Sequence, residues 1–146
     1  MANPVESTQA RTRILLADDN PAVLAGICRL LEEKFEIVGT VEDGTALLAA
    51  ARKLNPDVVI TDIMMPGLSG MDAVRRLKKL PHIKAKAILL TVLIDPSLAE
   101  EARAAGVMGY VVKVSADRDL VDAIHAVMAG EFYLSPMLRC TSPAKS

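Results

Sequence analysis

The sequence predicts an α/β fold in which five parallel strands form a doubly wound sheet, built from five strand-helix units in succession. Short β-branched or aliphatic runs alternate with segments of helical periodicity, which is typical of parallel βα units. Most of these runs are apolar throughout, as expected for strands covered by helices on both faces. A chain of 146 residues, of which 51% are hydrophobic, has the length of one domain with one sizeable core.

The first unit is expected at residues 13–31. Arg13 to Ala17 is a largely aliphatic run that predicts a strand, and a helix is expected from Pro21. The helix has an apolar stripe at i, i+3, i+4 and i+7, formed by Leu24, Ile27, Cys28 and Leu31. Cys28 is expected to fill core volume, because two cysteines are too few for a disulfide framework or a thiolate metal site.

The second and third strands are expected at residues 36–41 and 58–61. The helix after the second strand has the apolar stripe Leu47, Ala50, Ala51 and Leu54. The helix after the third strand turns Met71, Val74 and Leu77 toward the core, and its other side holds Arg75, Arg76, Lys78 and Lys79. We interpret that basic side as a solvated helix face, and a docking surface is the alternative.

The fourth and fifth strands are expected at residues 87–91 and 110–112. The helix after the fourth strand has a thinner stripe, formed by Leu98, Ala102 and Ala105, and Gly106 is expected as its left-handed cap. The last helix has the stripe Leu120, Ile124 and Val127, widened by Val121 and Met128 and followed by Gly130 as a second cap. This wide apolar face would suit a homodimer, but it could equally be buried against the sheet.

Composition and charge exclude several classes of protein. The 17 basic and 18 acidic residues give a net charge of −1, which removes any broad attraction to DNA or anionic lipid. With two Phe, two Tyr and no Trp, a base-stacking surface is not expected either. The longest nearly apolar run, residues 87–94, is far shorter than a membrane-spanning helix of ~20 residues, and the N-terminus has no secretory signal. We expect a cytoplasmic protein that contacts neither membrane nor nucleic acid directly.

Acidic and polar residues follow four of the five expected strands. Asp18 and Asp19 come after the first, Asp62 after the third, Thr91 ends the fourth and Lys113 follows the fifth. Taken singly, each has an ordinary explanation such as a helix cap or a local turn. The carboxyl ends of parallel strands share one edge of the sheet, which is where such folds bind ligands. We therefore expect these side chains to converge.

Such a set of side chains predicts phosphoryl chemistry with a divalent cation. Three adjacent carboxylates repel one another unless a cation relieves the repulsion. Mg²⁺ suits carboxylate, carbonyl and water ligands and needs only one or two carboxylates. A carboxylate beside such an ion, with a lysine and a hydroxyl opposite, can accept a phosphoryl group, because the surrounding charges stabilise the one that is transferred.

The sequence resembles the receiver domains of two-component response regulators over about residues 11–133. The matching stretches stand in the family's order: Leu16 to Pro21, Asp62 to Gly70, Thr91, and Gly109 to Lys113. The ending, with the run Gly-Glu-Phe-Tyr-Leu-Ser-Pro from Gly130, is most similar to the NarL/FixJ class. Receivers of that class usually precede a DNA-binding helix-turn-helix domain. The resemblance implies a flavodoxin-like, CheY-like sheet with strand order 2-1-3-4-5.

The resemblance also implies roles for the acidic residues. Asp62 would be the phosphoacceptor and would take a phosphoryl group from a sensor histidine kinase. Asp19, Asp62 and the backbone carbonyl of Met64 would bind Mg²⁺ directly, and Asp18 would bind it through a water molecule. Such a chain is a signalling switch rather than an enzyme, although it would catalyse parts of its own phosphorylation and dephosphorylation.

Three further residues are implied to transmit the phosphorylation signal. Lys113 would pair with the acyl phosphate, Thr91 would swing its hydroxyl to a phosphate oxygen, and Tyr110 would move inward behind it. These movements would repack the surface formed by the fourth helix, the fifth strand and the fifth helix. Added phosphate charge and acceptor oxygens must find new partners among nearby residues, so the same conclusion follows from the chemistry.

Several positions depart from the family pattern. Val92 stands where many receivers have Ala, and Met64 and Leu93 are apolar at two positions that influence how water reaches the acyl phosphate. We therefore expect slow self-dephosphorylation. Lys113 is followed by Val114 instead of the common Pro, which leaves the isomer of that peptide bond open.

Three other functions were considered. A Mg²⁺-dependent phosphatase of the haloacid dehalogenase type would need a DxDxT strand ending, which is absent after Asp62, and a cap-sized insertion. A scaffold with the receiver fold but no phosphorylation is disfavoured by the complete acidic set. A nucleotide-binding flavodoxin-like protein would need a glycine-rich loop after the first strand, and none is present.

The domain organisation follows from the same pattern. Residues 1–10 are expected to form a flexible N-terminus, residues 11–133 the receiver domain, and residues 134–146 a tail or the start of an interdomain linker. We expect the residues from 135 onward to be mobile. A longer regulator that continues into an effector domain and controls transcription is favoured over a stand-alone receiver.

Overall fold

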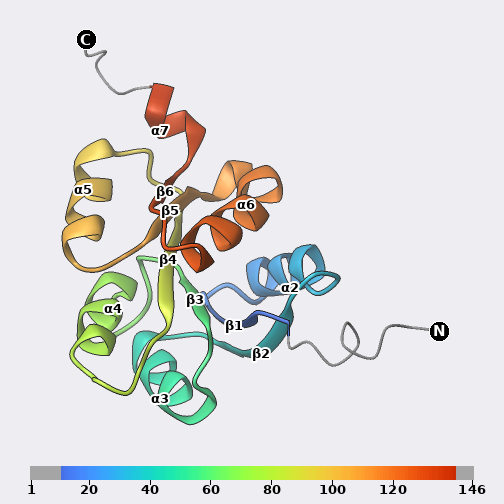
Figure 1. Ribbon diagram of the computed structural model, residues 1–146, viewed down its shortest axis with the longest axis vertical. Helices are drawn as coiled ribbons and strands as arrows, with labels where there is room; N and C mark the ends of the chain where they lie inside the picture. Colours follow the sequence, from blue (N-terminus) through green and yellow to red (C-terminus); the bar gives the residue numbers. More distant parts are fainter. Residues whose placement is uncertain (1–10, 141–146) are drawn as a thin grey trace.

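A single parallel sheet of six strands, in the order β2-β1-β3-β4-β5-β6, forms the centre of the molecule. The computed structural model describes residues 11–140 (Figure 1). The strands are β1 (Arg13–Ala17), β2 (Glu36–Val41), β3 (Val58–Thr61), β4 (Lys86–Thr91), β5 (Gly109–Val112) and β6 (Tyr133–Leu134). The order of the first five strands confirms the prediction, whereas β6 was not predicted.

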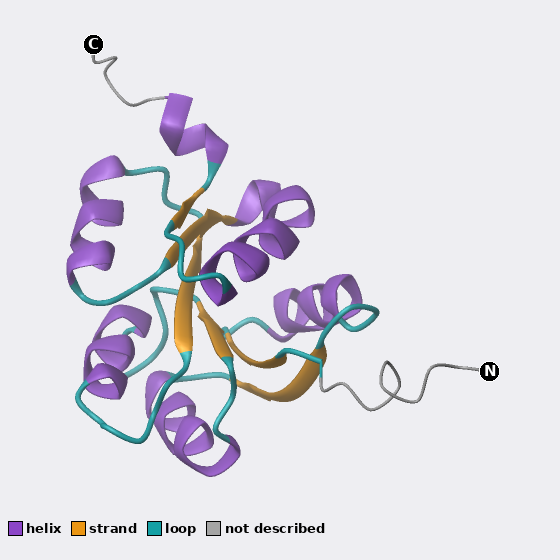
Figure 2. Ribbon diagram, in the orientation of Figure 1, coloured by secondary structure: helices purple, strands orange, loops and turns teal. Residues whose placement is uncertain are grey.

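Helices cover both faces of the sheet, as the doubly wound prediction requires (Figure 2). They are α2 (Pro21–Leu31), α3 (Gly44–Leu54), α4 (Gly70–Lys78), α5 (Pro96–Ala104), α6 (Ala116–Met128) and α7 (Pro136–Cys140), with a short 3-10 helix η1 (Lys113–Ser115) before α6. Helices α2 and α6 pack on one face, and α3, α4 and α5 pack on the other (Figure 1). No helix within residues 11–140 is long and apolar enough to span a bilayer.

The inner strands β1, β3, β4 and β5 are largely apolar because both of their faces are buried. In β1, Ile14 and Leu16 belong to the core under α2 and α6, whereas Leu15 and Ala17 belong to the core under α3 and α4. Successive side chains of a strand point to opposite faces, so a strand between two helical layers has no polar side. The continuous hydrophobic runs of the sequence are explained by this arrangement.

The helical stripes also lie where the sequence places them. Cys28 is partly buried and packs against the core of the α2 and α6 face, which confirms its expected role. Val121 packs against the same core, whereas the side chain of Met128 is 43% exposed. Most of the wide face of α6 is therefore buried against the sheet. The basic side chains of α4 are exposed, and Gly106 and Gly130 both adopt positive φ at the expected helix ends.

The C-terminal segment differs from the expectation. Residues from 135 onward were expected to be mobile, but β6 pairs in parallel with β5, and Ser135 and Leu138 are buried. The packed chain thus continues past the expected boundary at residue 133. A strand of two residues and a helix of five are too short to show a periodic pattern, so docking against β5 had no sequence signal. Residues 1–10 and 141–146, also expected to be mobile, lie outside the described part.

Candidate functional site

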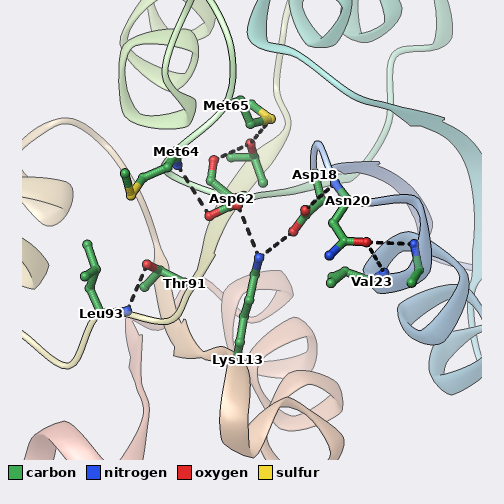
Figure 3. A network of polar contacts seen from close by, with 11 residues as sticks. Asp18, Asn20, Val23, Asp62, Met64, Met65, Thr91, Leu93 and Lys113 are labelled. Carbon is green, nitrogen blue, oxygen red and sulfur yellow. Dashed lines mark hydrogen bonds and ion pairs between the residues drawn. The ribbon is translucent and has the colours of Figure 1, made fainter.

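The carboxyl ends of β1, β3 and β5 bring three carboxylates and one ammonium group to one edge of the sheet, as predicted. Figure 3 shows Asp18, Asp62 and Lys113 of this group. Asp18 and Asp19 follow β1, Asp62 follows β3 and Lys113 follows β5. One carboxylate oxygen from each aspartate lies within 4.8 Å of the others. Asp18 and Asp62 are buried, whereas Asp19 is exposed at the mouth of the site.

A local hydrogen bond orients Asp18, and Asn20 caps the following helix in place of Asp19. The backbone N–H of Asn20 donates to Asp18 Oδ1 at 2.9 Å. The side chain of Asn20 then caps α2, because its Oδ1 accepts the N–H of Ala22 at 2.9 Å. The N-cap of α2 is therefore Asn20 and not Asp19. Asp19 is thus available to the site.

Lys113 holds the two buried carboxylates together. Its Nζ lies 2.7 Å from Asp18 Oδ2 and 3.2 Å from Asp62 Oδ2. Burial alone would lower the pKa of Lys113, but the two carboxylates outweigh it and raise that pKa. None of the described peptide bonds is cis, so Lys113–Val114 is trans. The lysine is therefore a firmly charged partner for the acidic residues.

The surroundings of Asp62 disfavour the charged form of its carboxyl group. Burial raises the pKa of the Asp62 carboxyl, the Lys113 ammonium opposes this rise, and the negative charge of Asp18 adds to it. The net result is a pKa above the usual value for an aspartate. An additional cation would therefore stabilise the charged form of Asp62.

The loop after Asp62 depends on Gly70. A Cβ atom at Gly70 would lie 1.9 Å from the carbonyl oxygen of Asp62, which no side chain could accommodate. The backbone N–H of Gly70 donates to the carbonyl of Ile63 at 2.8 Å, and this bond closes the loop over the start of α4. The close approach of the two backbone segments sets the direction in which Asp62 leaves β3.

Thr91 and Tyr110 meet at Leu93, in the loop after β4. Thr91 Oγ1 accepts the N–H of Leu93 at 3.1 Å, and the hydroxyl of Tyr110 donates to the carbonyl of Leu93 at 3.1 Å. Burial, followed by the charge of Asp95, raises the pKa of Tyr110 to about 12. The side chain of Tyr110 is fully buried in this structure. Thr91 lies at the same edge of the sheet as Asp62 (Figure 3).

The acidic cluster has the chemistry of a hard-metal site. The buried Oδ2 of Asp18 has Lys113 Nζ as its charged partner at 2.7 Å. Three carboxylates face a single ammonium group, which leaves the cluster with excess negative charge. Three carboxylates whose oxygens lie within 4.8 Å of one another, and whose charge one ammonium group does not balance, fit a divalent cation that prefers oxygen ligands.

Sequence reasoning missed two residues beside the site. Asp119 and Ser135 are buried near the backbone of Lys113, and the hydroxyl of Ser135 donates a hydrogen bond to the carboxylate of Asp119. They are sixteen residues apart in the chain: Asp119 lies on α6, and Ser135 directly follows β6. No spacing pattern connects such residues, so only the folded chain reveals their proximity to the site.

Comparison with known proteins agrees with this geometry. The model of the response regulator receiver domain matches residues 14–125. The response regulator GacA of Pseudomonas viridiflava is 36% identical over 128 residues, which are 86% of this chain and 59% of that protein. The transcriptional regulatory protein DesR of Bacillus subtilis is 36% identical over 127 residues, covering 86% of this chain and 62% of that protein. This chain thus spans about three fifths of the length of these relatives.

Solved structures show the same fold. A LuxR-family two-component response regulator from Aurantimonas superposes with a TM-score of 0.83 at 32% identity, over 90% of this chain and 94% of that one. The isolated receiver domain of RcsB from Salmonella enterica serovar Typhimurium, in the presence of the phosphomimetic BeF₃⁻, gives a TM-score of 0.80 at 30% identity, over 88% and 96% of the two chains. The chain belongs to the receiver domain family of two-component response regulators.

Proposed function

We propose that this chain accepts a phosphoryl group on Asp62 from a sensor histidine kinase, in a reaction that needs Mg²⁺. The observation that carries the proposal is the position of Lys113 Nζ between the carboxylates of Asp18 and Asp62, at 2.7 Å and 3.2 Å. Asp62 is the buried aspartate directly after β3, and it is ion-paired with Lys113 at 3.2 Å. A nucleophile in such a place needs only positioning and charge stabilisation from its neighbours.

The transfer balances as a substitution at phosphorus. A carboxylate oxygen of Asp62 forms a bond to the phosphorus atom, the bond from phosphorus to the histidine nitrogen of the kinase breaks, and that nitrogen keeps the electron pair. Asp19, Asp62 and the carbonyl of Met64 would hold Mg²⁺ directly, and Asp18 would hold it through water. The ion would supply positive charge beside the phosphoryl oxygens. Lys113 pairs with one of those oxygens from the opposite side.

The contacts of Leu93 suggest how the signal leaves the site. Thr91 Oγ1 accepts the N–H of Leu93 at 3.1 Å, so a rotation of its hydroxyl toward a phosphoryl oxygen would disturb the loop that contains Leu93. The carbonyl of Leu93 is bound by Tyr110 at 3.1 Å, so a movement of the loop is felt by the buried ring. The surface formed by α5, β5 and α6 would then repack. Only a difference in contacts between the two states can shift their equilibrium, and Thr91 would supply that difference.

Slow self-dephosphorylation is part of the proposal. The side chains of Met64 and Val92 are 64% and 66% exposed, and Leu93 and Ile94 lie exposed in the adjoining loop. None of these apolar side chains can hold a water molecule in line with the acyl phosphate. The chain would thus act as a switch whose phosphorylated state persists.

The relatives suggest the wider role. DesR is described as a transcriptional regulatory protein, and a solved structure of RcsB contains dimers bound to DNA. We propose that this receiver controls transcription through an effector domain outside the sequence described here, and that it forms homodimers when phosphorylated. The chain itself would make no direct contact with nucleic acid.

Intact-mass analysis with acetyl phosphate tests the central proposal. The wild type should gain one phosphoryl group when Mg²⁺ is present, Asp62→Asn should gain none, and Asp122→Asn, which changes an exposed aspartate of α6, should behave as the wild type. An equal gain in the Asp62 variant, or no gain in the wild type, contradicts the proposal and favours a scaffold without phosphorylation. Repeated release of phosphate from small esters would instead indicate a phosphatase.

A further inference from the structure

A buried polar network surrounds the backbone of Lys113. The hydroxyl of Ser115 lies 2.6 Å from Asp119 Oδ2, and the hydroxyl of Ser135 donates to the same oxygen at 3.0 Å. Ser135 Oγ also accepts the backbone N–H of Val112 at 3.0 Å. All three polar side chains are buried, with exposures of 6%, 7% and 0% for Ser115, Asp119 and Ser135.

This network does more than end a helix. Ser115 occupies the N-cap position directly before α6, yet its side chain makes no capping hydrogen bond to that helix. Asp119 instead binds two hydroxyls that come from different segments, on η1 and after β6. Leaving a buried carboxylate or N–H group without a partner is expensive, so each member of the network depends on the others.

Ser135 continues the hydrogen bonding to β5 beyond the last paired residue of β6. Beyond the paired residues of β5 and β6, the backbone N–H of Ser135 donates to the carbonyl of Tyr110 at 3.0 Å. Two residues further along β5, the backbone N–H of Val112 donates to the side-chain hydroxyl of Ser135 instead of to a backbone carbonyl. Val112 directly precedes Lys113, and Ser115 follows two residues after it. The network therefore holds the backbone on both sides of the lysine.

We infer that Asp119 and Ser135 are positioning residues for Lys113, and that residues 133–138 are thereby a working part of the phosphorylation site. The inference rests on the proposed function and extends it to the segment that leaves the domain. At its tip, the lysine side chain is held by the ion pairs with Asp18 and Asp62. Its Nζ must stay near Asp62 while the charge of that residue changes, and a fixed backbone provides this.

The same segment contacts the signalling residue of the site. Leu138 is 1% exposed and lies in one core cluster with Tyr110 and Val112. Segment 133–138 thus meets both the anchor of Lys113 and the ring of Tyr110. Because coupling between two sites is reciprocal, a change at the phosphoacceptor that moves β5 must also alter the docking of this segment.

Labelling kinetics separate positioning from mere stabilisation. The rate of labelling by acetyl phosphate and Mg²⁺ is measured by intact mass on folded wild type, Ser135→Ala and Asp119→Ala, with Asp117→Ala as the control, because Asp117 is exposed in the same helical turn. Ser135→Ala and Asp119→Ala should slow labelling about tenfold, the effect of losing one buried hydrogen bond to a charged network. Asp117→Ala should leave the rate unchanged. Should Asp119→Ala not fold, Asp119→Asn keeps the volume and should slow labelling in the same direction.

The same measurement in a Lys113→Ala background tests whether Ser135 acts on the labelling rate through Lys113. Combined with Lys113→Ala, Ser135→Ala should slow labelling no further, because the residue that it positions is gone. Equal slowing in both backgrounds, or labelling at the wild-type rate in Ser135→Ala, overturns the inference.

Failure of the proposed function can be told apart from failure of this inference. If the wild type is not labelled at Asp62, the proposed function fails, but a crystal structure of Ser135→Ala still reports the distances from Lys113 Nζ to Asp18 and Asp62. Displacement of Nζ, together with faster hydrogen exchange at the Val112 amide, supports the inference. Unchanged distances of 2.7 Å and 3.2 Å overturn it.

Discussion

Replacing Lys113 by methionine should destabilise the protein by about 2–3 kcal/mol at pH 7, and most of that loss should vanish in acid. The substitution keeps an unbranched side chain of similar length but removes the charge that separates Asp18 from Asp62. At an effective dielectric constant of ~20, the attraction is about 6 kcal/mol for the contact at 2.7 Å and about 5 kcal/mol for the contact at 3.2 Å. Desolvation of the three charged groups offsets a large part of this attraction.

The net effect follows from the burial of the three side chains. Breaking a fully buried ion pair leaves an uncompensated charge and typically costs about 3–5 kcal/mol. The side chain of Lys113 is 20% exposed and those of Asp18 and Asp62 are 4% and 11% exposed, so solvent screening lowers the expected value to about 2–3 kcal/mol.

The pH dependence has a definite sign. Burial already raises the pKa of Asp62 above its unfolded value of 3.8, and loss of the opposing Lys113 charge raises it further. An acid whose pKa is raised by folding destabilises the folded state once the pH exceeds the unfolded pKa, and the penalty is complete above the folded pKa. The difference between wild type and Lys113→Met should thus be small near pH 4 and grow toward pH 7.

Urea unfolding at several pH values measures this difference. Lys113→Met combined with Asp62→Asn should recover part of the lost stability, because one of the two facing carboxylates is removed. Lys79→Met, which changes an exposed lysine after α4, is the matched control and should have little effect at any pH. An equal loss of stability at pH 4 and pH 7, or no recovery in the double variant, would refute this electrostatic reasoning.

Three further predictions concern the switch and the fold. Thr91→Ala should still be labelled by acetyl phosphate but should lose the change in hydrogen exchange of the surface formed by α5, β5 and α6, and an intact change would contradict the role of that hydroxyl. Alkaline titration followed by ultraviolet absorbance should show a tyrosine that ionises at about pH 12 in the wild type, and this transition should be absent in Tyr110→Phe. If Tyr110→Phe instead removes a transition near pH 10, the hydroxyl of Tyr110 is not buried as described. Gly70→Ala should destabilise the protein by more than about 3 kcal/mol in urea because its Cβ would overlap the carbonyl of Asp62, whereas Gly26→Ala, which has open space in α2, should be neutral or stabilising by up to about 1 kcal/mol.

The strands and helices of the sheet could be read from the sequence with small errors. Strands β4 and β5 begin one residue earlier than expected, at Lys86 and Gly109. The long apolar runs were informative because burial on both faces leaves no room for polar side chains within them. The segment after Tyr133 was not readable, because docking against β5 stabilises it and no local pattern accompanies such docking.

By itself, the sequence determined which residues stand at the ends of the strands, and therefore that Asp18, Asp62 and Lys113 share one edge of a parallel sheet. Position relative to a strand end is a local property, which periodicity and turn residues reveal. Only the tertiary structure decided that Lys113 bridges the two buried carboxylates and that Asn20 caps α2. It alone decided that Ser135 binds the backbone beside that lysine. These contacts join segments far apart in the chain or choose between neighbouring side chains, and their geometry is set by packing of the whole domain.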